Sequence, residues 1–498
     1  MHSILPTRTG VASPLLVRPK RRHLGAVAIA TFALVLNACS SGGQKVAENN
    51  STPVTTRAAA RLVGLNRAVG YGLLRIMKLG ERPDPLDVVI YDALPNEMPR
   101  VAGVITTVMQ TPLSHVNLRA IQDSVPNAVV TNALGDASVT KLVGRYVRFE
   151  VTSDSYTLVA ATQTEVEAHH AKERPKTAQR PQRDLTVKDI TPLDEVSFDQ
   201  WTSFGVKSAN VATLRTFNLA DVVVPDGFAV PFSFYDEFMR SNGLYRVAKS
   251  FLANKRFASD PDYQDAQLEA FRKLIKDSPM PTNLSDALAD VRVKFPEKQS
   301  IRCRSSTNNE DLPGFSGAGL YDSRTQHPGE GPIDKCIKQV FSSVWNLRAY
   351  LEREYYRIDH LTTAMGVLLI PNTTNEQANG VAVSIDPVYN EPDAYYVNAQ
   401  LGENLVTNPE ALAVPEELLL YGEGTMDVVS RSSLVTPGEM LLSAANIAKL
   451  RSALAVIHRR FASLYQVESG TKFAMEIEFK ITESGQLMIK QARTWQFR

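Results

Sequence analysis

The spacing of apolar positions predicts an α/β unit in the first third of the chain. Short apolar runs at 87–93 and 101–108 are typical of strands, and residues 111–123 follow with the pattern of a helix. Two more strands are predicted near 128–131 and within 145–159. Together these elements make a unit of about 80 to 100 residues, an ordinary size for a small domain.

Upstream of this unit, Ala58, Leu62, Leu65 and Val69 recur at helical spacing, which predicts a short helix. It follows a tract of Ser, Gly, Gln, Asn and Thr that is typical of a flexible tether. We therefore assign residues 40–84 to a tether with a short helical segment, and residues 85–164 to the α/β domain.

Residues 165–195 are dense in charge and proline and lack apolar periodicity, so we expect an exposed, mobile linker between two domains. Residues 196–498 alternate helical and strand patterns, which predicts a large α+β domain with two lobes that meet near residue 370. The expected fold class is therefore multidomain, with an α/β domain followed by an α+β domain.

Residues 1–39 have the pattern of an export signal. Basic residues at 18–22 precede an apolar run, Leu24–Leu36, that is too short to span a bilayer comfortably, and Ala38 and Cys39 follow it. The pattern resembles a bacterial lipoprotein signal peptide. The resemblance implies a lipid on Cys39 and an exported chain held on the periplasmic or cell-surface side of a membrane.

The amino-acid composition limits the kinds of partner and metal that the chain is expected to bind. The chain has 498 residues, and its 54 Lys and Arg against 53 Asp and Glu give a net charge of +1, which offers no general attraction to nucleic acid. Besides Cys39, the remaining cysteines are Cys303 and Cys336, which either pair in an oxidising compartment or stay as buried free thiols. No His/Cys cluster suggests a zinc or iron site.

His115 has the sequence context best suited to covalent chemistry. Thr111 is a good N-cap and Pro112 suits the first helical position, so His115 falls in the first helical turn. There, free N–H groups and the helix dipole disfavour the imidazolium form. A neutral imidazole is the nucleophile that phosphoryl transfer to histidine requires. On geometry alone, a packed or capping histidine is the commoner occurrence.

The segment Leu113–Arg119 resembles the phosphohistidine segment of glucan, water dikinases and, more distantly, that of pyruvate phosphate dikinase and phosphoenolpyruvate synthase. In those families the histidine lies in a swivelling domain that visits an ATP site and then an acceptor site. The resemblance therefore implies that residues 85–164 are a phosphohistidine domain. Leu113 departs from the small residue that many members place near this point.

Separated motifs in residues 196–498 resemble the ATP-grasp-like ATP-binding domain of the same families. In Phe204–Asn210 the resemblance implies that Lys207 meets ATP phosphates, the alternative being a solvated surface lysine. Ile301–Ser323 is the longest match, and its alternative is a Gly-rich surface loop. An arginine at a strand end supplies a fixed donor fork, and small residues let backbone N–H groups approach phosphate oxygens. The implied nucleotide-binding residues there are Arg304, Ser305, Gly317 and Gly319, with Glu403 as an acidic residue further along.

The last residues predict a β-hairpin that brings two oxygen ligands together. Apolar and polar residues alternate over Phe473–Ile481, and a second strand, Leu487–Arg493, follows a turn. Such a hairpin can place Glu478 beside Gln491, and carboxylate and amide oxygens suit Mg²⁺. Both segments resemble the metal-binding segments of the same dikinase domains, whereas the alternative is an exposed hairpin with ordinary charges.

The resemblance implies a dikinase that binds Mg-ATP and passes the β-phosphate through His115 to an acceptor, with Arg304 as a second catalytic residue. Its domain order is that of glucan, water dikinases. No starch-binding module or pyruvate-binding barrel is recognisable, so the acceptor, a polysaccharide or a small molecule, stays open. Two alternatives remain: a membrane-anchored ATP-binding module without catalysis, and an antibiotic phosphotransferase.

Overall fold

The structure, a computed structural model, describes residues 62–495 apart from residues 96–97, 111, 113, 311, 313–314, 316, 318, 405–412 and 471. For Leu62, Val63, His115, Leu118 and Gln122 it describes the backbone alone. Cys39 and the expected signal peptide and tether lie outside the described residues. In the described part of the chain, no helix has both the length and the apolar character needed to span a bilayer.

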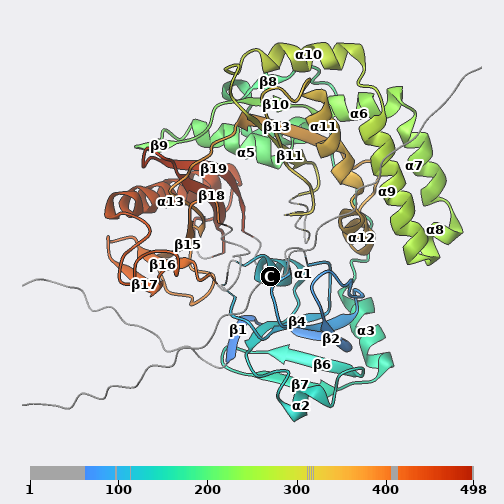
Figure 1. Cartoon of the computed structure of the whole chain (residues 1–498), viewed down its shortest axis with the longest axis vertical. Helices are drawn as coiled ribbons and strands as arrows, with labels where there is room; N and C mark the ends of the chain where they lie inside the picture. The colour runs from blue at the N-terminus through green and yellow to red at the C-terminus, as the bar shows by residue number, and fades with distance from the viewer. Residues whose placement is uncertain are drawn as a thin grey trace, which may run out of the picture. The chain divides into compact units, whose positions relative to one another are not determined.

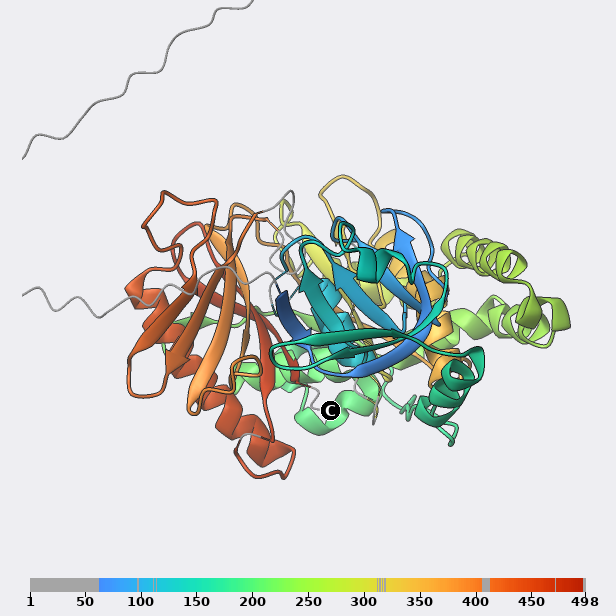
Figure 2. The ribbon, with the colours of Figure 1, turned by 90° about the horizontal axis from the view of Figure 1, so that it is seen from below.

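A seven-stranded sheet with the order β1-β5-β4-β3-β2-β6-β7 opens the described chain (Figure 1). Its strands β2, β3, β4 and β5 run parallel, while β1, β6 and β7 are antiparallel to their neighbours. Every residue of β3, β4 and β5 is buried, as expected of parallel strands covered on both faces. Strands β6 and β7 form an outer edge (Figure 2). The elements are β1 (Leu62–Asn66), β2 (Val69–Met77), β3 (Asp87–Tyr91), β4 (Gly103–Thr106), α1 (His115–Asp123), β5 (Asn127–Val130), α2 (Ala137–Thr140), β6 (Tyr146–Val151) and β7 (Tyr156–Ala160).

The helix predicted around Ala58–Val69 is wrong within the described residues. Leu62 and Leu65 belong to β1 and Val69 begins β2, so their spacing runs across two strands instead of along one helix. Strand β2 lies between β3 and β6, and pairing on both sides overrides the local apolar spacing. The sheet therefore begins before residue 85, where the sequence pattern placed the start of the domain.

The expected linker is partly helical. Helix α3 (Gln163–Glu173) begins at a capping box formed by Thr162 and Glu165, and its Val166 is only 1% exposed. His170 Nε2 lies 2.8 Å from the carbonyl oxygen of Tyr71 on β2. The Thr-x-x-Glu signature of the capping box was the local signal that the composition of this segment obscured.

A five-stranded antiparallel sheet, with the order β12-β11-β13-β10-β8, follows. Helices surround its core, in which Trp345 is fully buried and donates to Tyr235. Cys303 and Cys336 are buried free thiols. The elements are β8 (Thr191–Pro192), α4 (Trp201–Phe204), α5 (Val206–Arg215), β10 (Phe228–Val230), α6 (Phe232–Ser241), α7 (Leu244–Leu252), α8 (Lys255–Ser259), α9 (Pro261–Asp277), α10 (Thr282–Arg292), β11 (Ile301–Thr307), β12 (Arg324–Gln326), α11 (Asp334–Ser342), α12 (Leu347–Tyr355) and β13 (Met365–Pro371), with short 3-10 turns at Leu193–Glu195, Phe198–Gln200 and Ser343–Trp345.

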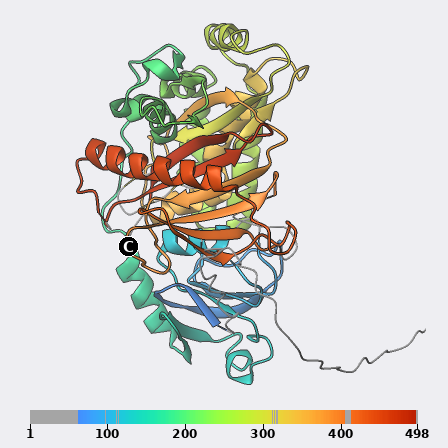
Figure 3. The ribbon, with the colours of Figure 1, turned by 90° about the vertical axis from the view of Figure 1, so that its left-hand side faces the viewer.

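A second seven-stranded sheet, with the order β17-β16-β15-β14-β18-β19-β9, completes the described chain. Helix α13 lies along one of its faces, where the apolar core forms (Figure 3). The change from the five-stranded sheet to this one falls between Pro371 and Ala378, close to the predicted lobe boundary near residue 370. The elements are β9 (Val222–Val223), β14 (Ala378–Val383), β15 (Ala394–Leu401), β16 (Glu416–Tyr421), β17 (Met426–Ser430), α13 (Ala444–Leu464), β18 (Met475–Ile481) and β19 (Leu487–Thr494).

Helix α5 contacts both β11 of the five-stranded sheet and β19 of the second seven-stranded sheet. Asn210 on α5 donates to the carbonyl oxygen of Ala492 on β19, and Ser208 N donates to Ser306 on β11. Because one helix is fastened to both sheets, the side chains that face the space between them are held in a defined arrangement.

Candidate active site

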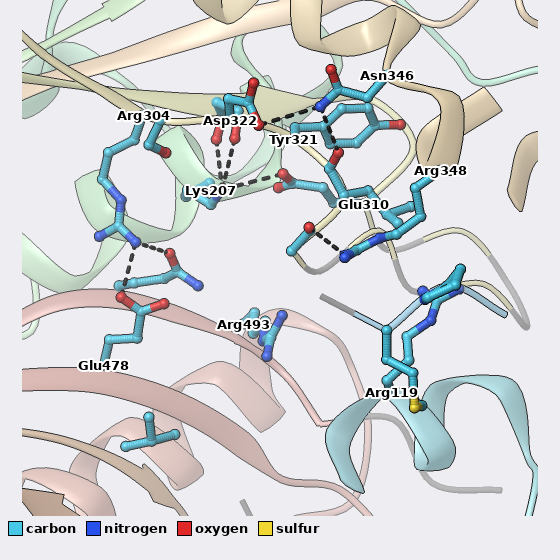
Figure 4. Close-up of a pocket in the computed structure, with 18 of the residues that line it drawn as sticks. Arg119, Lys207, Arg304, Glu310, Tyr321, Asp322, Asn346, Arg348, Glu478 and Arg493 are labelled. Carbon is cyan, nitrogen blue, oxygen red and sulfur yellow. Dashed lines mark hydrogen bonds and ion pairs between the residues drawn. The ribbon is translucent and has the colours of Figure 1, made fainter. Parts of the chain in front are cut away.

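A cavity of about 1070 Å³ lies between these sheets and is also lined by residues from the first sheet and from α1. Its lining carries more cationic than anionic side chains, which makes it suited to a multiply charged anion. The cationic residues are Arg82, Arg119, Lys207, Arg272, Arg304, Arg324, Arg348, Lys490 and Arg493, and the acidic ones are Glu81, Glu310, Asp322, Glu476 and Glu478. Figure 4 shows Lys207 near Glu310, Arg304 above Glu478, and Arg119 rising from α1.

Lys207 reaches the cavity from the first turn of α5. Gly205, just before this helix, has φ +85°, and a Cβ there would lie 2.4 Å from the carbonyl oxygen of Ser306. Only glycine lets the helix start so close to β11. Lys207 Nζ donates to the carbonyl oxygen of Ser305 at 2.6 Å and to Glu310 Oε1 at 3.2 Å. Burial lowers the pKa of Lys207, and the neighbouring Glu310 partly offsets this effect.

Arg304 joins the two sheets across the cavity. It lies on β11, and its Nη2 donates to Glu478 Oε2 at 2.9 Å and to Gln491 Oε1 at 2.6 Å. Its Nη1 donates to the carbonyl oxygen of Lys490 at 3.1 Å. A guanidinium held by three acceptors presents a fixed fork of donors, which is the geometry suited to phosphate.

The predicted hairpin is present, and Glu478 on β18 lies directly opposite Gln491 on β19. Burial by itself would raise the pKa of Glu478, but attraction to Arg304 and Lys490 outweighs burial and holds that pKa well below its usual range. Glu478 is therefore a carboxylate at neutral pH, and its oxygens and that of Gln491 face the same cavity.

This pair of oxygens fits Mg²⁺, which is usually held by one or two protein oxygens, with water and substrate phosphates completing its octahedron. Within the described residues, no group of three or more His, Cys, Asp or Glu side chains could hold a metal by itself. Glu478 and Gln491 are the residues that would hold a magnesium ion here, and the ion would supply positive charge beside bound phosphates.

The Gly-rich segment forms another wall. Gly317 N donates to the carbonyl oxygen of Glu310 at 2.7 Å, and a Cβ at Gly317 would lie 2.9 Å from the Cα of Glu310. Gly319 lines the cavity, and its carbonyl accepts from Arg348 on α12. Gly317 therefore braces this wall, with its N–H bonded to Glu310, while Gly319 lines the cavity. The expected approach of these glycines to phosphate stays a prediction.

His115 is the first residue of α1. The helix is capped by Ser114, whose Oγ accepts from Asn117 N at 3.1 Å, so it starts later than the predicted cap at Thr111, a residue outside the described ones. Asn117 also donates to the carbonyl oxygen of Pro112 at 2.7 Å, which holds the entering loop in place of a longer helix. Position 115 is thus at the positive end of the helix.

Arg119, one turn after His115 on α1, lines the cavity. In contrast, Glu403 is exposed in the turn after β15 and does not line the cavity. Of the predicted nucleotide-binding residues, Lys207 in the first turn of α5 lies close to Arg304 and Ser305 on β11, with Gly319 on the facing wall. Arg304 lies in the middle of β11 and not at the strand end that the sequence suggested.

Sequence reasoning assigned no role to several cavity residues. Glu310 and Asp322 lie inside the long motif, and Asn346 donates to Asp322 Oδ1 at 3.2 Å. Arg348 follows on α12, and Arg493 pairs with Glu476 across the hairpin. The signal for Arg493 was available, because residues 476 and 493 face each other in the same predicted hairpin as Glu478 and Gln491.

A lysine at the start of a helix, an arginine on the adjoining strand, a carboxylate–amide oxygen pair and a glycine-containing wall define a domain that binds nucleotide phosphates. Residues 201–498 match the family described as pyruvate phosphate dikinase, AMP/ATP-binding domain, and the chain belongs to this family. The match contains Lys207, Arg304, Glu478 and Gln491.

Curated relatives match less than half of the chain. Phosphoenolpyruvate synthase of Aeropyrum pernix is 29% identical over 221 residues, which cover 43% of this chain and 26% of the relative. Rifampicin phosphotransferase of Bacillus cereus is 26% identical over 220 residues, which cover 44% of this chain and 25% of the relative. The matches therefore span about a quarter of each relative, and they place the chain in the pyruvate phosphate dikinase and phosphoenolpyruvate synthase superfamily.

Among solved structures, D-cycloserine synthetase overlaps 52% of this chain and 73% of its own, at 12% identity and a TM-score of 0.20. This similarity is too low to support an argument about fold or function.

Replacing Lys207 with methionine tests its contact with ATP phosphates. We expect ATP binding to weaken by about 10- to 100-fold, because a hydrogen bond to a charged group contributes about 1.5–3 kcal/mol. Isothermal titration calorimetry with Mg-ATP measures the change. Lys276→Met, an exposed lysine on α9, is the matched control and should bind as the wild type does. Equal affinities for both variants would contradict a phosphate contact at Lys207.

Glu478 should also make stability depend on pH. Its folded pKa lies below the ordinary value of 4.5, so its ionised form stabilises the folded protein above that pH, and the contribution is lost as pH falls through the lowered pKa. We expect wild type to exceed Glu478→Gln in urea midpoint near neutral pH, with a difference that shrinks below about pH 4. A difference that stays constant or grows on acidification would show that the charge is not the cause.

Proposed function

We propose that the protein is an ATP-dependent phosphotransferase that carries phosphate on His115. One observation carries this proposal: the cavity of an AMP/ATP-binding domain is lined in part by α1, the helix that begins at His115. An anion-binding cavity and a histidine at a helix N-terminus are the two parts that phosphoryl transfer through histidine requires.

In this proposal the chain's own residues hold and neutralise the phosphates. Lys207 and Arg304 donate to phosphate oxygens, with Gly319 and Ser305 in the adjoining walls, while Glu478 and Gln491 would hold Mg²⁺, which supplies charge neutralisation when it is bound. Positioning and electrostatic stabilisation provide most of the rate in such transfers. The bond between the α- and β-phosphates of ATP breaks and AMP leaves, while the β-phosphate bonds to a nitrogen of His115. A water molecule takes the γ-phosphate, which leaves as orthophosphate.

The acceptor is a hydroxyl of either a polysaccharide or a small molecule. The order of the parts, with the histidine helix before the ATP-binding region, supports a dikinase similar to glucan, water dikinases. The likeness to rifampicin phosphotransferase supports a small-molecule acceptor. A panel of glucans and antibiotic hydroxyl compounds, each incubated with labelled ATP, separates these two.

Transfer through His115 is tested with ATP labelled at the β or the γ position. We expect the purified protein to gain acid-labile label from the β position alone, and His115→Ala to gain none because the accepting nitrogen is absent. His327→Ala, which removes an exposed histidine outside the cavity lining, is the control and should label normally. Tight ATP binding without any label on wild type would instead favour an ATP-binding module without catalysis.

We also propose that the protein is an exported lipoprotein anchored through Cys39. In bacterial cells that express the full chain, metabolic labelling with palmitate should mark the wild type and not Cys39→Ala, because this cysteine carries the acyl group in the proposal. Cys336→Ala controls for the loss of a thiol. Equal labelling of all three proteins, or labelling of none, would contradict the proposed lipid anchor at Cys39.

A further inference from the structure

A buried cluster of charges joins α1 to α12. Arg119 on α1 forms an ion pair with Glu352 on α12, and its Nε lies 3.1 Å from Asp123 Oδ2. Arg100 reaches the other oxygen of Asp123 at 3.1 Å and donates to the hydroxyl of Tyr356 at 3.2 Å. The cluster therefore connects the part that carries His115 with the ATP-binding region.

The cluster is enclosed and neutral. Glu352 is 1% exposed, Arg119 and Asp123 are each 4% exposed, and Arg100 is 9% exposed. The Arg100 guanidinium also lies 3.5 Å from the centre of the Tyr355 ring. Two cations and two carboxylates are thus ion-paired out of water, where an unpaired member would be strongly unfavourable.

Arg119 and Glu352 each lie one helical turn after a residue at the candidate active site. Arg119 follows His115 by four residues on α1, and Glu352 follows Arg348 by four residues on α12. Positions four apart lie on the same side of a helix. Arg119 and Arg348 both line the cavity, and Figure 1 shows α1 and α12 beside the same space. A contact between these helices therefore fixes the distance between the start of α1 and the cavity.

We propose that the Arg119–Glu352 pair is a releasable docking contact, which seats the His115-bearing part on the ATP-binding region for transfer. Arg119 and Glu352 act as positioning residues in it. This inference rests on the proposed function, since a carrier histidine must approach ATP in one step and leave in the next. The inference adds to the proposed function the two residues that hold the docked state.

The ionic nature of the contact suits release. The cost of removing water from a buried ion pair cancels much of its attraction, so the pair selects one docked geometry without holding it firmly. When the parts separate, both charges regain water. Arg119 then keeps Asp123, which belongs to the same helix and also pairs with Arg100. An apolar contact of equal size would be harder to open.

The test uses the full chain and the variant Glu352→Gln, which keeps shape and removes charge. We expect this variant to bind ATP with an affinity within about twofold of that of the wild type. At saturating ATP, transfer of the β-label to His115 should be slower by about tenfold or more, because an uncompensated Arg119 disfavours docking. Arg119→Gln should slow transfer to a similar extent, and the double variant should transfer no more slowly than Arg119→Gln alone. Glu354→Gln, on the same helix but paired with His360, is the matched control.

A distance measurement separates docking from catalysis. Nitroxide labels at Ser138→Cys and Lys276→Cys, two exposed positions on α2 and α9, report the separation of the two parts by double electron–electron resonance. We expect a narrow distribution in wild type and Glu354→Gln, and a broader, longer one in Glu352→Gln. The double variant Arg119→Met/Glu352→Leu should restore the narrow distance distribution and slow the separation of the two parts.

The outcomes are distinguishable. Unchanged distances and unchanged transfer in Glu352→Gln would overturn the docking contact. If the wild type gains no label on His115 while Glu352→Gln still loses the narrow distance distribution, the proposed phosphotransferase activity would be contradicted and the docking contact would be supported. Slower transfer with an unchanged distance distribution would also overturn the inference, since Glu352 would then act in some way other than docking.

Discussion

The site depends on keeping several cations close together in a partly enclosed space. Arg304 and Lys207 would repel each other and lose hydration without partners, so the fold supplies Glu310, Glu478 and Gln491 as acceptors. Glu478 and Gln491 come from the second seven-stranded sheet and Glu310 from the turn after β11, so the site depends on the packing of one sheet against the other through α5.

Backbone geometry sets how near the cations come to a ligand. The conformation of Gly205 places the start of α5 against β11, and Gly317 lets its own backbone lie against Glu310. The result is a lysine, an arginine and two walls whose positions are set before a ligand arrives. Preorganised donors of this kind stabilise developing charge without reorganising during reaction. The same arrangement suits both simple nucleotide binding and phosphoryl transfer.

The contact between α1 and α12 adds a second level of organisation. The residues proposed to contact phosphate belong to the ATP-binding region, while the proposed phosphate carrier belongs to the first sheet's part of the chain. Charges, not apolar side chains, occupy the centre of their contact at Arg119 and Glu352. Buried charges of this kind suit the proposed docking contact, which forms in one orientation and opens again.

The sequence by itself determined the features that local pattern encodes. Alternation and a short turn fixed Glu478 opposite Gln491, and the motifs identified Lys207 and Arg304, whose roles in binding remain predictions. Local pattern could not place β1 and β2, since their strand state comes from pairing with distant strands, and it overlooked the capping box of α3. Only the tertiary structure decided that Arg304 spans both sheets and that Arg119 meets Glu352. Such pairs are far apart in the chain, and a contact between them depends on how whole elements pack, which no local spacing records.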